Sequence, residues 1–455
     1  MKSFNAIYFV GAGGIGMSAL IRYYLAKGIP VGGYDRTPSP LTDQLIGEGA
    51  TIHFEDDVRL IPATFLDPAL TLVVRTPAVP ESHSELTYFR NEGFEIIKRA
   101  ALLGYITRSS KGLCLAGTHG KTTTSSMTAH LLHQSHVDCT AFLGGILKNY
   151  QSNLILSTTS DLTVIEADEY DRSFHQLSPY MAAITSSDPD HLDIYGDEAN
   201  YLESFNHFTS LVQPHGVLIM RKGQKVEPRL AEGVKLYSYS GEEGGDFHAT
   251  NVRIGQGTIV FDFVHPKGVI ADVELGVPVR INIENGVVAM AMGWLNGMTD
   301  EELRRGMRSY EGAARRFDFH IKTDDCVYID DYAHHPDEIK ASISSVKALY
   351  PDKRISVVFQ PHLYSRTQDF APEFADSLDL ADEIILMDIY PARELPIPGV
   401  TSEIIYNRLK KRDKTLCNKE TLLELIKERK FEVLLTLGAG DIDRFVDQIK
   451  DILLK

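Results

Sequence analysis

The sequence predicts an α/β protein made of three consecutive α/β units, and three observations support this fold class. Apolar runs of strand length alternate with helix-like segments along the chain, which is typical of parallel sheets covered by helices. Two of these apolar runs lead directly into glycine-rich turns of the nucleotide-binding type. The length of 455 residues is sufficient for roughly two to four domains.

The first unit begins with a glycine-rich turn between a predicted strand and a predicted helix. Ala6–Val10 is apolar, and Gly11-Ala12-Gly13-Gly14-Ile15-Gly16 then fits G-x-G-x-x-G before a helix-like segment that runs to Ala26. A second predicted strand, Val31–Asp35, ends in an acid suited to a ribose hydroxyl. This fingerprint predicts a nucleotide diphosphate and does not specify a redox cofactor, because a nucleotide-sugar satisfies the same contacts. A tight turn without a ligand is the alternative.

The second unit opens with a shortened phosphate-binding loop. Leu113–Ala116 predicts a buried strand, Gly117-Thr118-His119-Gly120-Lys121-Thr122-Thr123 follows it, and a helix-like pattern covers Ser125–Leu132. In this arrangement backbone N–H groups and the helix dipole hold phosphate oxygens. Lys121 is expected to reach the terminal phosphates and Thr122 to bind magnesium. The loop lacks the first glycine of the usual pattern, and an ordinary glycine turn is the alternative.

Two polar clusters follow predicted strands of this second unit. Glu166-Ala167-Asp168-Glu169 comes after the apolar run Leu162–Ile165, and Asp188-Pro189-Asp190-His191 comes shortly after Met181–Thr185. If these strands are parallel, both clusters lie at the carboxyl edge of the sheet, where open α/β sheets place their sites. Glu166 and His191 are then expected to join Thr122 as ligands of a metal held against phosphates. A solvated acidic loop and a surface histidine are the alternatives.

The third unit opens with the basic segment Arg315-Arg316-Phe317-Asp318, whose arginines suit phosphate oxygens unless the segment is only a solvated linker. Val327–Ile329 predicts a strand, and Asp330-Asp331-Tyr332-Ala333-His334-His335 follows it. That polar run also allows a zinc site, although the sequence nearby offers no further ligand set with metal spacing. A strand at Val433–Leu437 and a helix over Ile442–Leu453 are predicted to close the unit.

Composition and charge argue against several classes of protein. The hydrophobic content of 43% and the charged content of 24% are ordinary for a globular protein. The net charge of −16 argues against a nucleic-acid-binding surface and against an anionic membrane as a partner. The sequence has no run of about 18 apolar residues and has four scattered cysteines without C-x-x-C spacing. We expect no secretory leader, because the apolar run Ala6–Val10 is short and leads directly into Gly11. We therefore expect a cytoplasmic protein with reduced thiols.

Taken in order, the motifs of all three units resemble those of the Mur ligases. They are Gly117–Thr123, Glu166–Glu169, Asp190-His191, Arg315–Asp318, Asp330–Pro336 and Phe359-Gln360-Pro361-His362. The resemblance covers essentially the whole chain. Within the family, Gly13–Leu20 and His119 favour the members that join L-alanine to UDP-N-acetylmuramate.

The resemblance implies three domains and an ATP-dependent ligation. Residues 1–107 would form a Rossmann-like domain for the UDP-sugar, 108–313 a central P-loop-type ATPase domain, and 314–455 a Rossmann-like domain that binds the amino acid and closes on the site. The implied reaction joins L-alanine to the lactyl carboxylate of UDP-N-acetylmuramate through an acyl phosphate, with ATP and Mg²⁺, in peptidoglycan precursor synthesis. We expect a monomer or homodimer with no nucleic-acid and no membrane partner.

The site residues follow from the resemblance position by position. Those implied to act in catalysis are Lys121, Glu166, His191 and Arg316, and the implied magnesium ligands are Thr122, Glu166 and His191. The implied ATP-binding residues are Gly117, Thr118, His119, Gly120, Lys121, Thr122, Thr123, Asn285, Arg316 and Asp331. The residues implied to bind the UDP-sugar are Gly13, Gly14, Ile15, Gly16 and Asp35, and those implied to bind the amino acid are His362 and Arg366.

Two positions depart from the family pattern, and other functions remain open. Glu284 stands before Asn285 where the family usually has histidine, and Leu363 follows His362 where arginine is common. An NAD-dependent oxidoreductase is an alternative supported by the first glycine-rich turn, but it leaves the phosphate loop and the acidic cluster without a function. A non-catalytic nucleotide-sugar sensor and a related ligase that recycles muropeptides are two further alternatives.

Overall fold

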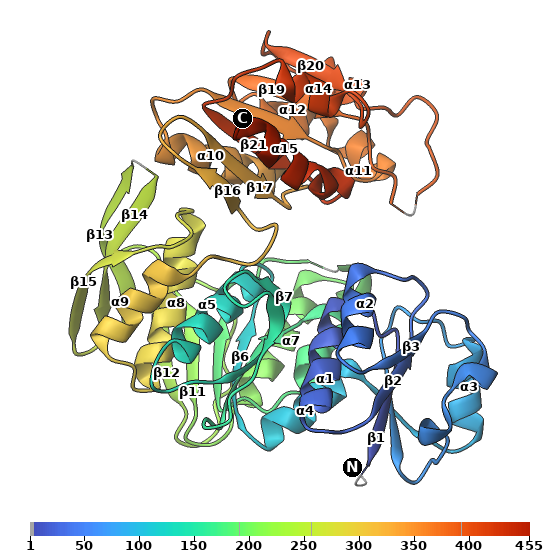
Figure 1. Ribbon diagram of the computed structural model, residues 1–455. Helices are drawn as coiled ribbons and strands as arrows, with labels where there is room; N and C mark the ends of the chain where they lie inside the picture. The colour runs from blue at the N-terminus through green and yellow to red at the C-terminus, as the bar shows by residue number, and fades with distance from the viewer. Residues whose placement is uncertain (1–3, 191, 256, 393) are drawn as a thin grey trace. The chain divides into compact units, whose positions relative to one another are not determined.

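The computed structural model describes residues 4–190, 192–255, 257–392 and 394–455, and the chain forms two compact units. The first unit comprises the chain up to Thr250 together with residues 263–270 and 284–307, and the second comprises residues 251–262, 271–283 and 308–455. Three sheets are present (Figure 1): the N-terminal sheet belongs to the first unit, the C-terminal sheet belongs to the second, and the central sheet has most of its strands in the first. The predicted α/β class is confirmed.

The N-terminal sheet is parallel throughout and has the strand order β3-β2-β1-β4-β5. Its strands are β1 (Ala6–Val10), β2 (Val31–Tyr34), β3 (Thr51–His53), β4 (Thr71–Arg75) and β5 (Glu95–Lys98). Its helices are α1 (Ile15–Ala26), α2 (Pro40–Gly47), α3 (Ser84–Asn91) and α4 (Arg99–Arg108). All five residues of β1 are buried, as expected for a central strand covered on both faces. The glycine-rich turn and Asp35 therefore follow neighbouring strands at the same edge of the sheet.

The central sheet has ten strands in the order β15-β14-β13-β12-β11-β10-β6-β9-β7-β8. The strands are β6 (Lys111–Ala116), β7 (Thr140–Leu147), β8 (Ser152–Ile155), β9 (Leu162–Ala167), β10 (Met181–Ile184), β11 (Val217–Arg221), β12 (Lys235–Ser240), β13 (Phe247–Gly255), β14 (Thr258–His265) and β15 (Gly268–Glu274). The helices are α5 (Lys121–His133), α6 (Leu192–Tyr195), α7 (Glu198–Ser210), α8 (Ile281–Leu295) and α9 (Asp300–Ser309). The strand β6 lies between β10 and β9 and pairs with both in parallel. The predicted parallel arrangement is thus confirmed, and it brings the residues after these three strands to one edge.

The N-terminal and central sheets share one hydrophobic core. Buried residues of α1 and α4, such as Leu20 and Leu103, belong to the same cluster as Phe142 of β7 and Ile165 of β9. The helix α1 contacts β7 and β8, and α4 contacts β6 and the 3-10 helix η3 (Tyr170–Gln176). The side chain of Asn153 on β8 donates to the carbonyl oxygen of Ile15 at 2.6 Å. The first glycine-rich turn is therefore held beside the central sheet.

The C-terminal sheet has the order β16-β17-β21-β18-β19-β20 and is parallel except for the edge pair β16–β17. Its strands are β16 (Asp318–Lys322), β17 (Val327–Asp331), β18 (Ile355–Phe359), β19 (Glu383–Met387), β20 (Lys414–Cys417) and β21 (Val433–Leu437). Its helices are α10 (Pro336–Leu349), α11 (Tyr364–Asp369), α12 (Ala371–Leu378), α13 (Glu403–Tyr406), α14 (Leu422–Lys427) and α15 (Val446–Leu453). The sheet has its own core, in which Tyr328, Val358 and Leu434 are fully buried.

The last helix differs from the prediction at its N-terminal end. A 3-10 helix covers Asp441–Phe445, and the α-helix begins only at Val446 rather than at Ile442. The side chain of Gln360 donates to Asp441 at 2.9 Å and accepts from the backbone N–H of Ile442 at 3.0 Å. This contact holds the start of the segment against the end of β18 in a tight turn, and the α-helix begins after it.

The cysteines and the helices bear on two expectations from composition. The four cysteines are free thiols, and all except Cys326 are buried. None of the helices in the described ranges combines the length and the apolar composition that crossing a membrane requires.

Candidate functional site

The phosphate loop has the backbone that its sequence predicts. Gly117 and Gly120 have φ values of 141° and 82°, which side chains other than glycine rarely adopt. A Cβ atom at Gly117 would collide with the Thr185 hydroxyl, and one at Gly120 would lie 2.8 Å from Asn285 Oδ1. The helix α5 begins at Lys121, four residues before the predicted start, so the loop opens directly at the positive end of a helix dipole.

Residues after β10 brace the phosphate loop from the side. The Thr185 hydroxyl donates to the carbonyl oxygen of His119 at 2.5 Å, and the Ser186 hydroxyl accepts from the backbone N–H of His119 at 2.8 Å. The Thr118 hydroxyl donates to the carbonyl oxygen of Asp188 at 2.7 Å. The positions of Thr185 and Ser186 after a strand parallel to β6 predict that they lie near the loop, but nothing in the sequence indicates that they shape it.

Lys121 is held by the loop itself and by a buried acid. Its Nζ donates to the carbonyl oxygen of Gly117 at 2.7 Å and to Glu169 Oε1 at 2.8 Å. The Glu169 side chain is 1% exposed, and burial raises the pKa of its carboxyl although Lys121 opposes this shift. Glu169 belongs to the acidic cluster found in the sequence, but it was not among the expected site residues. Its function depends on a contact with Lys121 that only the folded sheet creates.

Glu166 and Thr122 form an oxygen-rich pair beside the loop. The Thr122 hydroxyl donates to Glu166 Oε1 at 3.1 Å, and Glu166 lies against Gly144 of β7, where a Cβ atom would collide with the carboxylate. Among the described residues, the buried Glu166 Oε2 has no hydrogen-bond partner. Burial raises the pKa of this carboxyl, and a cation beside it would offset the cost of its charge. A hydroxyl and a buried carboxylate are ligands that magnesium prefers, so these residues fit the ion.

His191 lies outside the described residues, so its expected contribution to a metal site is not located. The structure does place Asn285, which is buried on α8 and accepts from the Thr124 hydroxyl at 3.2 Å. Its neighbour Glu284, at a position that departs from the family pattern, forms an ion pair with Arg221 at 2.9 Å. Asn285 is thus next to the phosphate loop, and the glutamate has its own partner on β11.

In the first glycine-rich turn, the glycines have different surroundings. The backbone N–H of Gly13 donates to Asp35 Oδ2 at 2.6 Å, and Asp35 Oδ1 accepts from the N–H of Thr37 at 3.1 Å. Asp35 therefore fastens the turn in addition to any contact with a ribose. A Cβ atom at Gly16 would collide with the guanidinium of Arg99, whereas one at Gly14 would have no neighbour closer than 3.8 Å.

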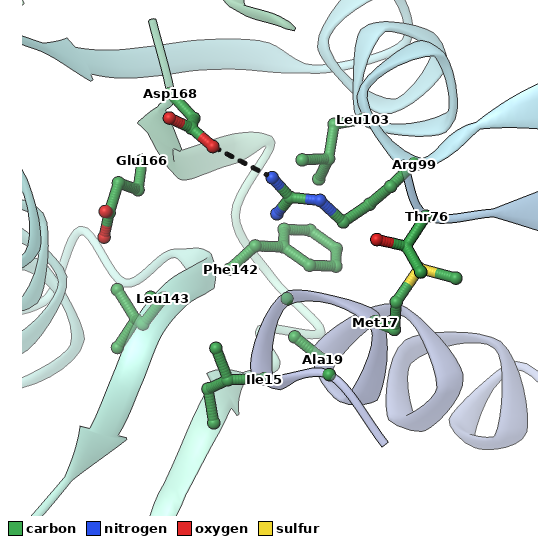
Figure 2. A pocket seen from close by; sticks show the side chains of 13 residues that line it. Ile15, Met17, Ala19, Thr76, Arg99, Leu103, Phe142, Leu143, Glu166 and Asp168 are labelled. Carbon is green, nitrogen blue, oxygen red and sulfur yellow. Dashed lines mark hydrogen bonds and ion pairs between the residues drawn. The ribbon is translucent and has the colours of Figure 1, made fainter. Parts of the chain in front are cut away.

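A pocket of about 340 Å³ joins this turn to the acidic cluster (Figure 2). Gly14, Ile15 and Gly16 line it from the turn, and Glu166 and Asp168 line it from the end of β9. Figure 2 shows the Arg99 guanidinium directed toward Asp168, and its Nη2 lies 3.4 Å from Asp168 Oδ2. The pocket thus brings four expected site residues to one cavity.

The predicted residues at the start of the C-terminal sheet have different surroundings. Arg315 donates to the carbonyl oxygen of Gly438 at 2.8 Å and pairs with Asp443 at 3.1 Å, so it ties loops together. Both guanidinium groups lie over the Tyr332 ring, that of Arg315 at 4.9 Å and that of Arg316 at 5.4 Å. Asp331 ends β17 and accepts from the Ser342 hydroxyl, and burial raises its pKa. Among the described residues, Arg315 thus has hydrogen-bond and ion-pair partners for its head group, whereas the head group of Arg316 contacts the ring of Tyr332.

The expected amino-acid-binding residues lie at the end of β18. The His362 ring lies 5.9 Å from the ring of His334 and stacks on Tyr390 at 5.8 Å. Within the described chain, the buried Nη1 atom of Arg366 has no hydrogen-bond partner. Leu363 between them has a φ of 71°, a strained backbone of the kind that occurs at binding sites. No group of three or more His, Cys, Asp or Glu side chains in the described ranges has metal-binding geometry, so the zinc alternative gains no support.

Nearly the whole chain matches known protein families. Residues 6–111 match the model of the Mur ligase family catalytic domain, 115–293 that of the Mur ligase middle domain, and 315–440 that of the Mur ligase glutamate ligase domain. A UDP-N-acetylmuramate–L-alanine ligase of Parabacteroides distasonis is 65% identical over 451 residues, which are 99% of this chain and 98% of that protein.

Solved structures agree with this placement. The UDP-N-acetylmuramate-alanine ligase MurC of Thermotoga maritima has a TM-score of 0.81 and 26% identity, covering 98% of this chain and 99% of that one. A murein peptide ligase of Psychrobacter arcticus shares the fold, with a TM-score of 0.65 and 21% identity over 98% of both chains. The matches to all three domain models and the extent of the identity show that the chain is a member of the Mur ligase family.

Proposed function

We propose that the protein ligates L-alanine to the lactyl carboxylate of UDP-N-acetylmuramate, with conversion of ATP to ADP and phosphate. The observation that carries the proposal is the pocket in which the first glycine-rich turn and Glu166 face one cavity, because Glu166 also contacts the phosphate loop through Thr122. A nucleotide-sugar held at the turn could extend its carboxylate toward the phosphates. The identity to a full-length ligase of this name supports the choice of substrates.

Phosphorylation makes the carboxylate reactive, because a free carboxylate is a poor acyl donor. A lactyl carboxylate oxygen attacks the γ-phosphorus, the bond to the β–γ bridging oxygen breaks, and ADP leaves. The amine nitrogen of L-alanine then attacks the acyl carbon, and the tetrahedral intermediate expels phosphate as the amine loses its proton. In such transfers the protein acts mainly by positioning groups and offsetting charge.

The residues around the phosphate loop suit the first of these steps. The N–H groups of Gly117–Thr123 would hold the ATP phosphates, and Lys121 would offset the charge that develops on the terminal ones. Thr122, Glu166 and His191 would hold Mg²⁺, which when bound offsets further phosphate charge. Asn285 and Asp331 are proposed to contact the nucleoside, and Arg316 the γ-phosphate.

The remaining residues are proposed to hold the other two substrates. Gly13–Gly16 and Asp35 would bind the UDP portion, while His362 and the Arg366 guanidinium would bind L-alanine through its carboxylate. Three domains over residues 1–107, 108–313 and 314–455 would divide these tasks. The use of ATP and the free thiols support a cytoplasmic location.

A phosphate-release assay tests the proposal. Release should require ATP, Mg²⁺, UDP-N-acetylmuramate and L-alanine together, and glycine and L-serine should serve as comparison amino acids. With ¹⁸O in the lactyl carboxylate, one label should appear in the released phosphate, because that oxygen bridges carbon and phosphorus in the acyl phosphate. Turnover only with a tripeptide in place of L-alanine would instead identify the muropeptide-recycling ligase.

A further inference from the structure

The pocket beside the first glycine-rich turn contains one arginine that the reaction described above does not use. Arg99 is the first residue of α4, and its side chain is 27% exposed. Among the described residues that line the pocket, it is the only cationic one, and it faces the two carboxylates Glu166 and Asp168. An anionic ligand that enters this pocket therefore has one protein cation to meet.

The glycine at position 16 leaves the space that Arg99 occupies against the turn. Its guanidinium lies against Gly16, where a Cβ atom would collide with Nη1 and approach Cζ to 3.0 Å. Gly16 is in the first turn of α1, whose N-terminal N–H groups attract phosphate. The arginine and the helix terminus thus face the same region, and a planar guanidinium is suited to phosphate oxygens.

The contact between Arg99 and Asp168 is long. The Nη2–Oδ2 distance to Asp168 is 3.4 Å, at the long end of a charge-assisted hydrogen bond. Asp168 is 37% exposed, and its Oδ1 separately accepts from the backbone N–H of Tyr170 at 3.1 Å. Asp168 therefore keeps a partner when the arginine moves away, so the exchange leaves no buried carboxylate unpaired.

We propose that Arg99 exchanges the carboxylate of Asp168 for the diphosphate of the nucleotide-sugar when this substrate binds. The inference rests on the proposed function, because it assumes that a nucleoside diphosphate sugar is the ligand at the turn. It makes Arg99 a residue that positions the substrate, and it makes Asp168 a competitor that lowers the affinity for the substrate.

The test compares the affinity of the full chain and its variants for UDP-N-acetylmuramate, UDP and ATP by calorimetric titration. Arg99→Ala should lower the affinities for UDP-N-acetylmuramate and UDP by a similar factor of about 10 to 100, which corresponds to the loss of one charge-assisted hydrogen bond. The affinity for ATP should not change. Arg99→Lys should fall between wild type and Arg99→Ala. Asp168→Asn keeps the acceptor for Tyr170 and should bind UDP about threefold more tightly, because the competing charge is gone.

Lys98 offers a matched control. Its Nζ pairs with Asp171 at 2.7 Å, so it also links α4's start to the region after β9, but it does not line the pocket. Lys98→Ala should bind UDP-N-acetylmuramate and UDP with affinities within about twofold of those of wild type. Gly14→Ala adds an independent check, since its methyl group has space in the protein but would occupy the proposed diphosphate position.

Several results would overturn the inference while leaving the proposed function intact. They are equal losses of UDP affinity in Arg99→Ala and Lys98→Ala, tighter UDP binding by wild type than by Asp168→Asn, and a loss in Arg99→Ala for UDP-N-acetylmuramate but not for UDP. The third result would assign Arg99 to the lactyl carboxylate. Unchanged UDP binding in Gly14→Ala would contradict the inference and the proposed UDP site together. Thermal unfolding of each variant identifies losses of affinity that come from misfolding. If Arg99→Ala is misfolded, the UDP affinities of Arg99→Lys and Asp168→Asn test the inference in its place. If wild type binds neither UDP ligand, the proposed function fails and the inference fails with it.

Discussion

The Nζ atom of Lys121 lies 2.7 Å from the carboxylate of Glu169, an acid whose side chain is 1% exposed. The same Nζ donates to the carbonyl oxygens of Gly117 and Thr118. The lysine of the phosphate loop is therefore fixed by groups in the segments that follow two neighbouring strands, β6 and β9. A buried carboxylate without a cation would be costly, so each member of the pair stabilises the charge of the other.

Glu169→Gln is expected to lower kcat about tenfold and to change the KM for ATP, because the neutral amide holds the Lys121 ammonium less well. The affinity for UDP-N-acetylmuramate should stay the same. Steady-state kinetics and titration measure the two effects. Glu198→Gln is the matched control, since Glu198 pairs with Lys225 at 2.6 Å on the exposed surface. A parallel loss in both variants would contradict a function of Glu169 in positioning the lysine.

Lys121→Ala is expected to abolish formation of the acyl phosphate while UDP-sugar binding stays nearly intact. The loss follows because the terminal phosphates lose the cation that offsets their charge. Phosphate release measures turnover, and retention of more than about a hundredth of the wild-type rate would refute the assignment of the loop. The affinity for UDP serves as the control for folding of the first domain.

Asp35→Ala is expected to raise the KM for the UDP-sugar far more than the KM for ATP. The carboxylate accepts from the N–H groups of both Gly13 and Thr37, so its removal loosens the turn as well as any ribose contact. Asp35→Asn retains one acceptor oxygen and should have the smaller effect. Equal increases in both KM values would show that the N-terminal domain is not the site of the sugar nucleotide.

A buried acid in the N-terminal domain predicts how stability changes with pH. Glu85 is fully buried and accepts from the Tyr8 hydroxyl at 2.8 Å, and burial raises the pKa of its carboxyl to about 8. The folded chain thus keeps a proton that the unfolded chain releases above its ordinary pKa. The free energy of unfolding should therefore fall as pH rises from about 4.5 to about 8 and then level off in this contribution.

Glu85→Gln should remove this dependence, so its melting temperature should exceed that of wild type increasingly from pH 5 to pH 8. Calorimetric unfolding at several pH values measures the difference. Glu95→Gln, on the neighbouring β5, supplies a control at a less buried carboxylate. A constant difference between wild type and Glu85→Gln over this range would contradict a raised pKa.

Local patterns in the sequence predicted most of the fold. The strands β1 and β6, the two glycine turns and the helices after them follow from apolar runs and glycine positions within a few residues. The contacts of Glu169, Thr185 and Arg99 join residues far apart in the chain, and the register of neighbouring strands creates them. The late start of α15 has the same origin, because Gln360 follows another strand, β18, far from Ile442 in the chain.

The common core of the first two sheets limits how substrate preference can be exchanged within the family. Residues such as Leu20 and Leu103 are buried among side chains of the central sheet. In a chimaera that takes residues 1–107 from one relative and the remainder from another, side chains from two different sequences would have to pack together in this core. Exchanging the N-terminal region together with the central sheet avoids that mismatch, because the shared core is then transferred intact.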